Sequence, residues 1–478
     1  MALVLTNTLS GRKEVLSPRE PGHVRLYWCG VTVYARSHVG HARALVTADV
    51  LCRYLRARGL RVTFVRNFTD IDDKIIRRAA DEGLTPAALA EREIAAFAGD
   101  VAWLGCLPPT HEPRATAHVP DMLALIARLV AKGFAYPVAG GSVYFRVRRF
   151  SDYGKLSHRR LEDMEAGEEI DPAKEDPHDF ALWKGAKPGE PAWESPWGPG
   201  RPGWHIECSA MAARYLGQPF DVHGGGSDLV FPHHENEIAQ SEADAGAPFA
   251  DLWVHNGMIT SGAEKMSKSL GNILAIADVA RRAPAEALRL LFLQTHYRAP
   301  LDFSSARLEE ADRALGRLYE SLARADTLPG APGESAVPVD GALAGDLDPA
   351  EAAFVEAMDD DLNAARGLGI VFDRVRDLNR LLDAGDAARG LALRRSLARI
   401  GAALGLLGAP PAAMLEAARA RGRERAGLTT AEIEAAIAAR DQARRRKDFR
   451  EADAIRARLR EQGIVLEDTP SGTLWKAG

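Results

Sequence analysis

Strand-like and helix-like patterns alternate along the first part of the chain. Residues 24–29 form an apolar run rich in residues that favour β-structure, as expected of a buried strand. Apolar residues at helical spacing follow through positions 44–55, and a second strand-like run spans residues 61–68. A strand, a helix and a strand within about fifty residues predict a βαβ unit and hence a parallel sheet.

The pattern changes after a helical stretch that extends from about residue 85 to residue 133. Residues 136–203 are rich in Pro, Gly and Trp and predict a connective insertion of short strands and loops. A second α/β stretch occupies residues 204–305 and includes a predicted strand at 251–255. The chain is therefore expected to begin with two α/β halves, residues 1–135 and 204–305, on either side of the insertion.

The remainder of the chain is helical and rich in Ala, Leu and Arg. Residues 306–425 are expected to form a helical unit, interrupted at about residues 326–350 by a linker of Pro, Gly and Asp. A helix is predicted to open at Asp359-Asp360-Asp361 and to continue through Leu378. A last unit covers residues 426–478.

The segment 440–460 is strongly basic, with nine Lys and Arg residues and four acidic ones, in a chain whose net charge is −5. Ala452, Ile455 and Leu459 form an apolar stripe at helical spacing, so we expect one amphipathic basic helix here. In an arbitrary protein such a helix is most often a solvated surface. The overall charge argues against a nucleic-acid coat, but a local basic patch suits a single structured RNA.

The composition argues against a membrane protein and against a disulfide-stabilised one. No run of eighteen apolar residues occurs, and the N-terminus lacks the basic and apolar regions of a signal peptide. The four cysteines, Cys29, Cys52, Cys106 and Cys208, are too few for a disulfide framework in 478 residues. We therefore expect a cytoplasmic protein whose cysteines are free thiols, metal ligands or nucleophiles.

Two short motifs suit the binding of a nucleotide. His38-Val39-Gly40-His41 lies where a helix begins after the first strand, and histidines three apart can face one way on a first helical turn. A helix N-terminus favours phosphate. Lys265-Met266-Ser267-Lys268-Ser269 places two lysines on a loop flanked by Gly and Ser, where they can stabilise developing charge. Taken alone, the first motif could equally be two unrelated surface histidines, and a two-lysine loop is usually solvated surface.

In this order, on α/β elements, the two motifs together resemble those of the class I aminoacyl-tRNA synthetases, with Val39 in place of the more usual isoleucine. The resemblance implies a Rossmann-like, doubly wound parallel sheet as the catalytic domain, followed by α-helical C-terminal domains. It implies that ATP is bound at Gly40 and by four catalytic side chains, His38, His41, Lys265 and Lys268. The carboxylate of the amino acid would attack the α-phosphate, and pyrophosphate would leave with Mg²⁺.

A second set of residues has the composition of a zinc site. Cys29 ends the first strand, Cys208 lies in a helical stretch, and His233 and His234 precede Glu237 by four and three residues. Two thiolates, an imidazole and a carboxylate are suitable zinc ligands. The spacing does not choose between His233 and His234. Composition alone would favour two buried structural thiols over a metal site.

The residues around these positions closely resemble the cysteinyl-tRNA synthetase family. The resemblance rests on three stretches: Tyr27-Trp28-Cys29-Gly30-Val31-Thr32, Trp204-His205-Ile206-Glu207-Cys208-Ser209 and Phe231-Pro232-His233-His234-Glu235-Asn236-Glu237. It implies one zinc ion per chain, held by Cys29, Cys208, His233 and Glu237. It further implies a cysteine pocket formed by Gly30, Thr32, Thr69 and Trp204, and an adenosine site at Gly224, Gly225 and Asp228 in Asp221-Val222-His223-Gly224-Gly225-Gly226-Ser227-Asp228.

A zinc ion would solve a problem of selectivity. Cysteine and serine differ by sulfur against oxygen, and a pocket that reads only shape separates such pairs poorly. Zinc prefers a soft thiolate to a hydroxyl, so the substrate thiol could bind it as an added or a replacing ligand. An editing domain would then be unnecessary.

The family resemblance also assigns a role to the C-terminal unit. It implies anticodon binding there, with Arg440, Arg444, Arg445, Lys447 and Trp475 as candidate contacts to tRNA(Cys), because phosphates attract Lys and Arg and unstacked bases need flat side chains. The implied substrates are ATP, L-cysteine and tRNA(Cys), and the implied state is a monomer.

Three other functions must be weighed against tRNA charging. A cysteine ligase of mycothiol biosynthesis shares the adenylating core and the zinc site but joins cysteine to a glucosaminyl-inositol amine, and it generally lacks the full C-terminal unit. An inactive synthetase-like RNA-binding protein would not need both nucleotide motifs. A generic nucleotidyltransferase would not need the zinc ligands.

Asp70, Asp72 and Asp73 are expected to mark a helix start rather than a metal site, and Cys52 and Cys106 are expected to be structural.

Overall fold

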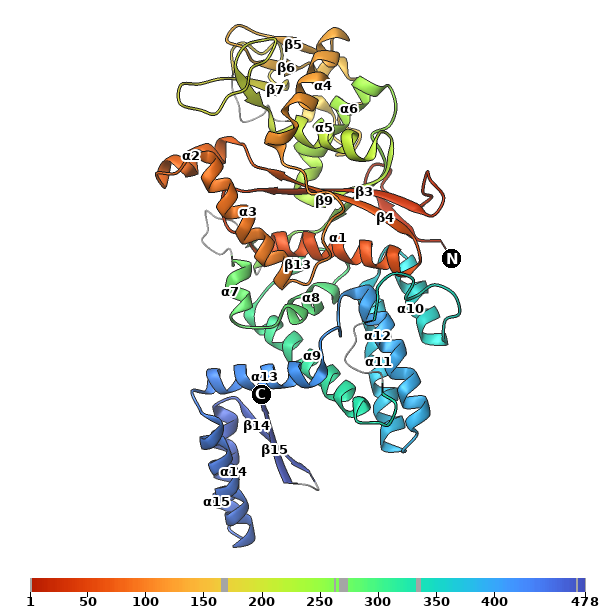
Figure 1. Ribbon diagram of the computed structural model, residues 1–478, viewed down its shortest axis with the longest axis vertical. Coiled ribbons are helices and arrows are strands. Elements are labelled where there is room, and N and C mark those ends of the chain that lie inside the picture. Colours follow the sequence, from red (N-terminus) through yellow and green to blue (C-terminus); the bar gives the residue numbers. More distant parts are fainter. Residues whose placement is uncertain are drawn as a thin grey trace.

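The computed structural model describes residues 2–164, 171–261, 264–265, 274–331, 337–469 and 472–477. At its centre lies a four-stranded, entirely parallel sheet (Figure 1). In the order β10-β9-β3-β4, its strands are β10 (Ala250–Asn256), β9 (Phe220–Gly226), β3 (His23–Thr32) and β4 (Arg61–Thr69). The parallel sheet predicted from the alternating patterns is confirmed.

Helices cover both faces of this sheet, and a separate hydrophobic cluster fills each interface (Figure 1). One face carries α1 (Val39–Ala57) and α3 (Pro86–Trp103). The other carries α4 (Val119–Ala131), α5 (Trp204–Leu216) and α6 (Glu235–Ala245). Successive residues of β3 alternate between the clusters, as strand geometry requires, and Cys29 faces the α5 and α6 side. The doubly wound arrangement is therefore present.

Strand β3 is irregular at the point where the site residues lie. It continues to Thr32 instead of ending at Cys29, and its register with β4 shifts between Trp28 and Val31. A side chain at Gly30 would meet the backbone oxygen of Asn67 at 1.6 Å, so only glycine fits this close approach. The irregularity places Cys29 and Gly30 outside the regular pairing with β4.

Within residues 135–202 the chain forms a small antiparallel sheet, at the top of Figure 1. Its strands follow the order β5 (Ala135–Pro137), β6 (Val143–Phe145), β7 (Phe180–Gly185) and β8 (Gly200–Pro202). Trp183 is fully buried between this sheet and the rest of the α5 side.

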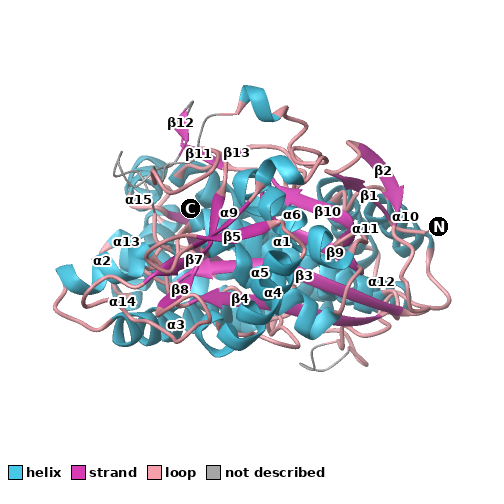
Figure 2. Ribbon diagram, turned by 90° about the horizontal axis from the view of Figure 1, so that it is seen from above, coloured by secondary structure: helices cyan, strands magenta, loops and turns pink. Residues whose placement is uncertain are grey.

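Two further small sheets flank the central one. β1 (Val4–Asn7) and β2 (Arg12–Val15) form an antiparallel hairpin. β12 (Glu264–Lys265), β11 (Ile259–Ser261) and β13 (Leu301–Asp302) lie together in that order (Figure 2). The helix α2 (Asp73–Asp81) follows β4. Short helical turns occur at η1 (Ala115–His118), η2 (Val147–Arg149), η3 (Leu161–Asp163), η4 (Ser227–Leu229) and η5 (Val230–His234).

After the sheet the described chain is helical up to the last unit. The helices are α7 (Ile276–Ala280), α8 (Ala285–Leu293), α9 (Ser305–Asp326), α10 (Pro349–Asp359), α11 (Ala364–Asp383), α12 (Ala387–Leu404) and α13 (Pro411–Ala426). α8, α9 and α12 pack against the same cluster as α1, so the helical part is joined to the central sheet through α1 (Figure 1).

The Asp359-Asp360-Asp361 run does not open a helix, contrary to the prediction. α10 ends at Asp359, Asp361 has a left-handed φ of 61°, and α11 begins only after the cap residue Asn363. Each carboxylate instead contacts another part of the chain. Asp359 accepts hydrogen bonds from the Tyr54 hydroxyl and Arg58, Asp360 pairs with Lys13, and Asp361 accepts from Thr6 and Tyr297.

The basic segment 440–460 is not a single helix either. It is divided between α14 (Thr430–Arg445) and α15 (Phe449–Glu461), which pack side by side before the hairpin β14 (Ile464–Thr469) and β15 (Gly472–Ala477). Lys447 adopts a left-handed φ of 61° and Asp448 caps α15, so the chain reverses there. The apolar stripe of Ala452, Ile455 and Leu459 is buried as predicted.

A buried ion pair joins the sheet domain to the helical part and should dominate local stability. Arg289 on α8 and Asp49 on α1 are both almost inaccessible, and Nη2 lies 2.6 Å from Oδ2. The same Nη2 donates to the Leu404 backbone oxygen at the end of α12. Because Asp49→Ala leaves a buried guanidinium without its carboxylate, we expect the free energy of unfolding to fall by about 3–5 kcal/mol.

Denaturant unfolding followed by tryptophan fluorescence measures this loss. The control is Asp373→Ala on α11, which removes an exposed pair with Arg376 and should change stability by less than about 0.5 kcal/mol. Equal effects of the two substitutions would contradict the role given to the buried pair.

Candidate functional site

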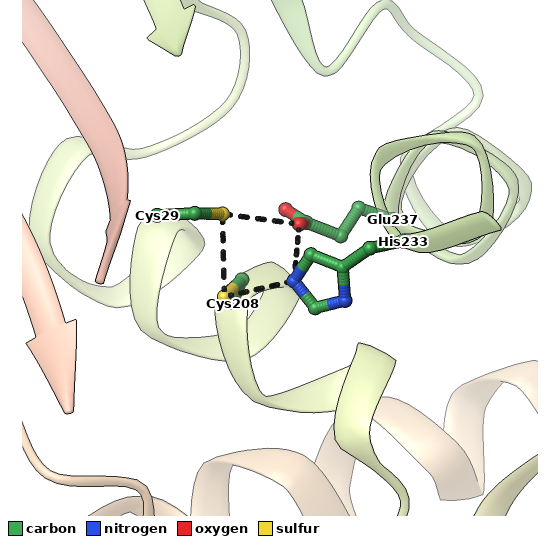
Figure 3. Close-up of side chains that lie close together, drawn as sticks. All are labelled: Cys29, Cys208, His233 and Glu237. Carbon is green, nitrogen blue, oxygen red and sulfur yellow. Dashed lines mark hydrogen bonds and ion pairs between the residues drawn. The ribbon is translucent and has the colours of Figure 1, made fainter. Parts of the chain in front are cut away.

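The predicted zinc ligands come together at the carboxyl ends of the central strands. Cys29 lies near the end of β3, Cys208 lies one turn into α5, and His233 and Glu237 lie around the start of α6. Figure 3 shows the four side chains pointing toward one another. All four are buried, and their donor atoms lie within 4.8 Å of one another. In an open α/β sheet, this edge is where ligands bind.

The distances between donor atoms match the edges of a tetrahedron around one zinc ion. Zinc–sulfur bonds of about 2.3 Å and zinc–nitrogen bonds of about 2.0 Å predict edges of roughly 3.8 Å between sulfurs and roughly 3.6 Å between sulfur and nitrogen. The two Sγ atoms lie 3.7 Å apart, and Cys208 Sγ lies 3.6 Å from His233 Nε2. Glu237 Oε1 lies 3.4 Å from Cys29 Sγ and 3.0 Å from His233 Nε2. The residues therefore fit the ion.

The charges of the cluster also favour a cation. Burial raises the pKa of the Cys29 thiol well above its usual value. Burial acts in the same direction on Cys208, but the hydrogen bond from Cys29 and the neighbouring His233 lower the pKa of Cys208 to about 6. Without a cation, the cluster therefore favours only one of its two sulfurs as a thiolate. A divalent metal reverses this preference, because coordinating thiols lose their protons.

Glu237 is held as a carboxylate from two sides. Burial would raise the pKa of Glu237, but the imidazoles of His223 and His233 outweigh it and hold that pKa well below its usual range. His223 Nε2 lies 2.8 Å from Oε2 of Glu237, while Oε1 faces the other ligands. His223 thus orients Glu237 through the carboxylate oxygen that faces away from the other ligands, as residues next to metal ligands commonly do.

The structure supplies a reason for preferring His233 to His234. His233 Nε2 is 3.0 Å from Glu237 Oε1, whereas His234 Nε2 is 3.9 Å from it. His234 is also bonded through Nδ1 to His255 Nε2 at 2.7 Å. A second group of four, Cys29, His223, His234 and Glu237, nevertheless meets the same distance limit and shares two ligands with the first.

The helix expected from Pro232 is present. Phe231 has extended dihedral angles, and the helical turn η5, which contains His233, runs directly into α6. His233 therefore reaches Glu237 four residues later, as predicted.

Two of the four predicted cysteine-binding residues, Gly30 and Trp204, lie directly beside residues of this cluster. Gly30 follows Cys29, Thr32 and Thr69 are paired across β3 and β4, and the Trp204 ring stacks on His233 with 4.2 Å between centroids. The structure adds two residues that the sequence did not indicate. Asn67 Oδ1 accepts from the Gly30 N–H and lies 3.8 Å from Cys208 Sγ, and Glu207 accepts a 2.6 Å hydrogen bond from the Thr69 hydroxyl.

His38 and His41 form the first turn of α1, as their spacing predicted, and their rings stack 3.7 Å apart. His38 Nδ1 accepts from the Gly40 N–H, and His41 Nδ1 accepts from the His38 N–H. Nε2 of each ring therefore carries a proton and can donate to a phosphate oxygen. The Val39 N–H donates to Leu274, so backbone groups of this turn are less available to phosphate than expected.

Close contacts with neighbouring side chains of the protein require glycine at the end of β9. A Cβ at Gly224 would lie 2.3 Å from the Trp28 ring, and one at Gly225 would lie 2.9 Å from His234. Asp228 is exposed in the turn after this strand, where a ribose could reach it. The backbone of Lys265 pairs with Thr260 in the β11–β12 hairpin. Lys268 and the rest of its motif lie outside the described residues.

Most of the remaining predictions near the site are borne out. Asp72 caps α2, Asp70 accepts from the Thr116 N–H and hydroxyl, and Asp73, in the first turn of α2, pairs with Lys184 and Arg201. Cys52 is buried in the core of α1, whereas Cys106 is partly exposed.

The C-terminal candidates divide into exposed and buried residues. Arg440 is 4% exposed and makes a bidentate pair with Asp468, with both distances 2.8 Å. It holds the last hairpin and does not face solvent, so its prediction as a tRNA contact is corrected. Arg444, Arg445 and Lys447 are exposed.

The structure points to a different aromatic residue of this unit from the one that the sequence suggested. Trp475 is half-buried, and the Arg423 guanidinium lies 5.8 Å from its ring centroid. Phe449, in contrast, is 62% exposed at the start of α15, beside Lys447 and Arg450. The sequence shows only that Phe449 lies within the basic run, and its exposure comes from the structure.

Among the helices of the described residues, none is long and apolar enough to span a bilayer.

Three family models match successive parts of the chain. Residues 15–313 match "tRNA synthetases class I (C) catalytic domain", residues 353–408 match "DALR domain", and residues 427–475 match "Cysteinyl-tRNA ligase anticodon binding domain".

Curated relatives match over the full length. The chain is 53% identical over 480 residues to "Cysteine--tRNA ligase" of Geobacter sulfurreducens, with all of both chains covered. It is 52% identical over 479 residues to the protein of the same name in Thioalkalivibrio sulfidiphilus, again with full coverage of both. Among solved structures, Mycobacterium tuberculosis methionyl-tRNA synthetase in complex with methionyl-adenylate matches with a TM-score of 0.57 at 17% identity, covering 86% of this chain and 96% of that one. This last likeness concerns the fold alone.

Proposed function

The chain belongs to the cysteine-tRNA ligase family of class I aminoacyl-tRNA synthetases, and on that premise we propose that it selects its substrate through a zinc ion held by four buried side chains. As a member of this family it charges tRNA with cysteine and binds ATP, the amino acid and tRNA. The observation that carries the zinc proposal is the tetrahedral spacing of Cys29, Cys208, His233 and Glu237.

The proposed selection depends on how the site is built. Zinc, when bound there, supplies a soft Lewis acid that distinguishes a thiol from a hydroxyl. Cys29 and Cys208 supply the sulfur ligands, and His223 fixes the Glu237 carboxylate from behind. Trp204 covers one side of His233, while Thr69 and Gly30 stand at the ends of β4 and β3 beside the cluster. These residues form the proposed pocket for L-cysteine.

We propose that ATP lies between this pocket and the start of α1. The Nε2–H groups of His38 and His41 would donate to its phosphates, Lys265 and Lys268 would supply positive charge, and Mg²⁺ would accompany the nucleotide. A side chain at Gly40 would collide with the His38 ring, so glycine leaves that imidazole in place. Gly224 and Gly225 keep the end of β9 free of side chains, and Asp228 would accept a hydrogen bond from the ribose.

We propose that the tRNA anticodon is held by the C-terminal unit, residues 426–478. Arg444, Arg445 and Lys447 are exposed there for phosphate contacts, and Phe449 replaces Trp475 as the proposed stacking surface.

A cysteine ligase of mycothiol biosynthesis is not favoured, because residues 427–475 match an anticodon-binding model. A monomer, a cytoplasmic location and the boundaries set from the sequence at residues 135, 203, 305 and 425 stay predictions.

The zinc proposal predicts the outcome of Cys208→Ser. Loss of one sulfur ligand should lower bound zinc well below one per chain and reduce cysteine-dependent pyrophosphate exchange by at least about 100-fold, because a poorly held metal loses affinity and activity together. ATP binding, measured by calorimetry, should change by less than about threefold, since Cys208 lies in the amino-acid pocket.

Cys52→Ser is the matched control, because it alters a buried thiol remote from the cluster. Wild-type protein that carries no zinc when freshly purified, or a Cys208→Ser variant that loses ATP binding and cysteine activation equally, would contradict substrate selection by the metal.

The anticodon proposal predicts the outcome of Phe449→Ala. Stacking of a base on an aromatic ring contributes about 1–3 kcal/mol, so kcat/KM for tRNA in aminoacylation should fall about 5- to 150-fold. Pyrophosphate exchange, which needs no tRNA, should stay unchanged. Phe449→Leu keeps apolar bulk without a ring and should lose nearly as much, whereas Phe449→Tyr should be close to wild type. Wild-type charging by Phe449→Leu would argue against stacking.

A further inference from the structure

Two residues beyond the His38–His41 turn lies a buried arginine that pairs with no carboxylate of the described residues. Arg43 on α1 is 1% exposed. Among the described residues it has hydrogen-bonding partners only at backbone oxygens, those of Met258, His296, Tyr297 and Ala299. Burial lowers the pKa of Arg43 to about 10. Burying an arginine without a counter-charge is unfavourable, so its position needs an explanation.

The four carbonyl groups do not require the guanidinium. Three of them already accept a backbone N–H: Met258 from Leu301, Tyr297 from Gly257 and His296 from Ala299. Each carbonyl oxygen can accept twice, and Arg43 adds the second bond. Its effect is therefore to join α1 to two chain segments, residue 258 and residues 296–299, that are already paired with each other.

These two segments lead into the sheet that carries the first lysine of the second nucleotide motif. Residue 258 precedes β11, residues 296–299 precede β13, and β11 pairs with β12, where Lys265 lies (Figure 2). The chain that follows β12, at residues 274–276, also contacts the start of α1. The Val39 N–H donates to Leu274, and the Ile276 N–H donates to Ser37. Both ends of the stretch between residues 258 and 276 are thus attached to residues 37–43.

We propose that Arg43 is a positioning residue for adenylate formation, which fixes the strand leading to Lys265 against the helix turn that carries His38 and His41. The inference rests on the proposed nucleotide roles of His38, His41 and Lys265. Arg43 need not touch ATP. It sets the separation between two groups that must act on the same phosphates, and displacement of one group by about 1 Å can cost about 100-fold in rate.

A further hydrogen bond connects residues 296–299 to the helical part of the chain. The backbone oxygen of Tyr297 accepts from Arg43, and the Tyr297 hydroxyl donates to Asp361 Oδ1 at 2.8 Å. Asp361 also accepts from the Thr6 N–H at 2.7 Å. The position of the β11–β13 sheet is therefore tied both to α1 and to the turn between α10 and α11.

Arg43→Lys is the decisive variant. Lysine keeps the charge but replaces a rigid fork by one ammonium, which cannot bridge the two segments in the same way. We expect kcat for cysteine-dependent pyrophosphate exchange to fall about 10- to 100-fold, with the KM for L-cysteine within about twofold of wild type and zinc content unchanged. Arg43→Met, which also removes the charge, should lose more.

Asp49→Ala is the matched control, because it weakens another buried arginine contact on the same helix and leaves the β11–β13 sheet untouched. It should lower the thermal midpoint while retaining kcat at 25 °C. If Arg43→Lys behaves in the same way, with a lower midpoint and unchanged kcat and KM for ATP, Arg43 is only structural and the inference is overturned.

His38→Ala separates failure of this inference from failure of the proposed nucleotide site. If His38→Ala lowers kcat but Arg43→Lys does not, only the positioning role is wrong. If neither variant lowers kcat, the nucleotide roles proposed for the start of α1 are wrong and the positioning role falls with them.

Discussion

The burial of four metal-binding side chains at one point is the constraint on which the rest of the site depends. Two sulfurs, a carboxylate and an imidazole converge from β3, α5 and α6, and none of the four is exposed to water. Without a metal ion, this set favours only one of its two sulfurs as a thiolate, and a divalent cation allows both to lose their protons. The register shift in β3, the close contact of Gly30 with Asn67 and the hydrogen bond from His223 all serve to bring these donors to tetrahedral distances.

The domains around the site are joined by charged side chains buried between them. Asp49 and Arg289 connect α1 to α8, and the carboxylates of residues 359–361 each bind a different part of the sheet domain. Arg43 adds hydrogen bonds that connect α1 to the segments leading into the β11–β13 sheet. Directional contacts of this kind fix orientation better than apolar packing does, which suits an enzyme whose two nucleotide motifs lie on separate elements.

Sequence patterns predicted the parallel sheet and the helical C-terminal part, whereas the four members of the proposed zinc cluster followed from the family resemblance. Spacing could not choose between His233 and His234, because both precede Glu237 by about one helical turn and both can approach it. Arg440 belonged to a basic run, but its long side chain turns inward to Asp468, which only the tertiary structure reveals. Lys447 in a left-handed turn gave no signal, since lysine rarely adopts that conformation. Asn67 and Glu207 act through contacts distant in sequence.

We propose that the cluster recognises the thiol of the substrate. X-ray absorption at the zinc edge, recorded for the protein alone and with saturating L-cysteine or L-serine, tests it most directly. We predict two sulfur neighbours in the protein alone and with L-serine, and a third only with L-cysteine. An unchanged sulfur count in all three samples would contradict the account and leave zinc as a purely structural ion.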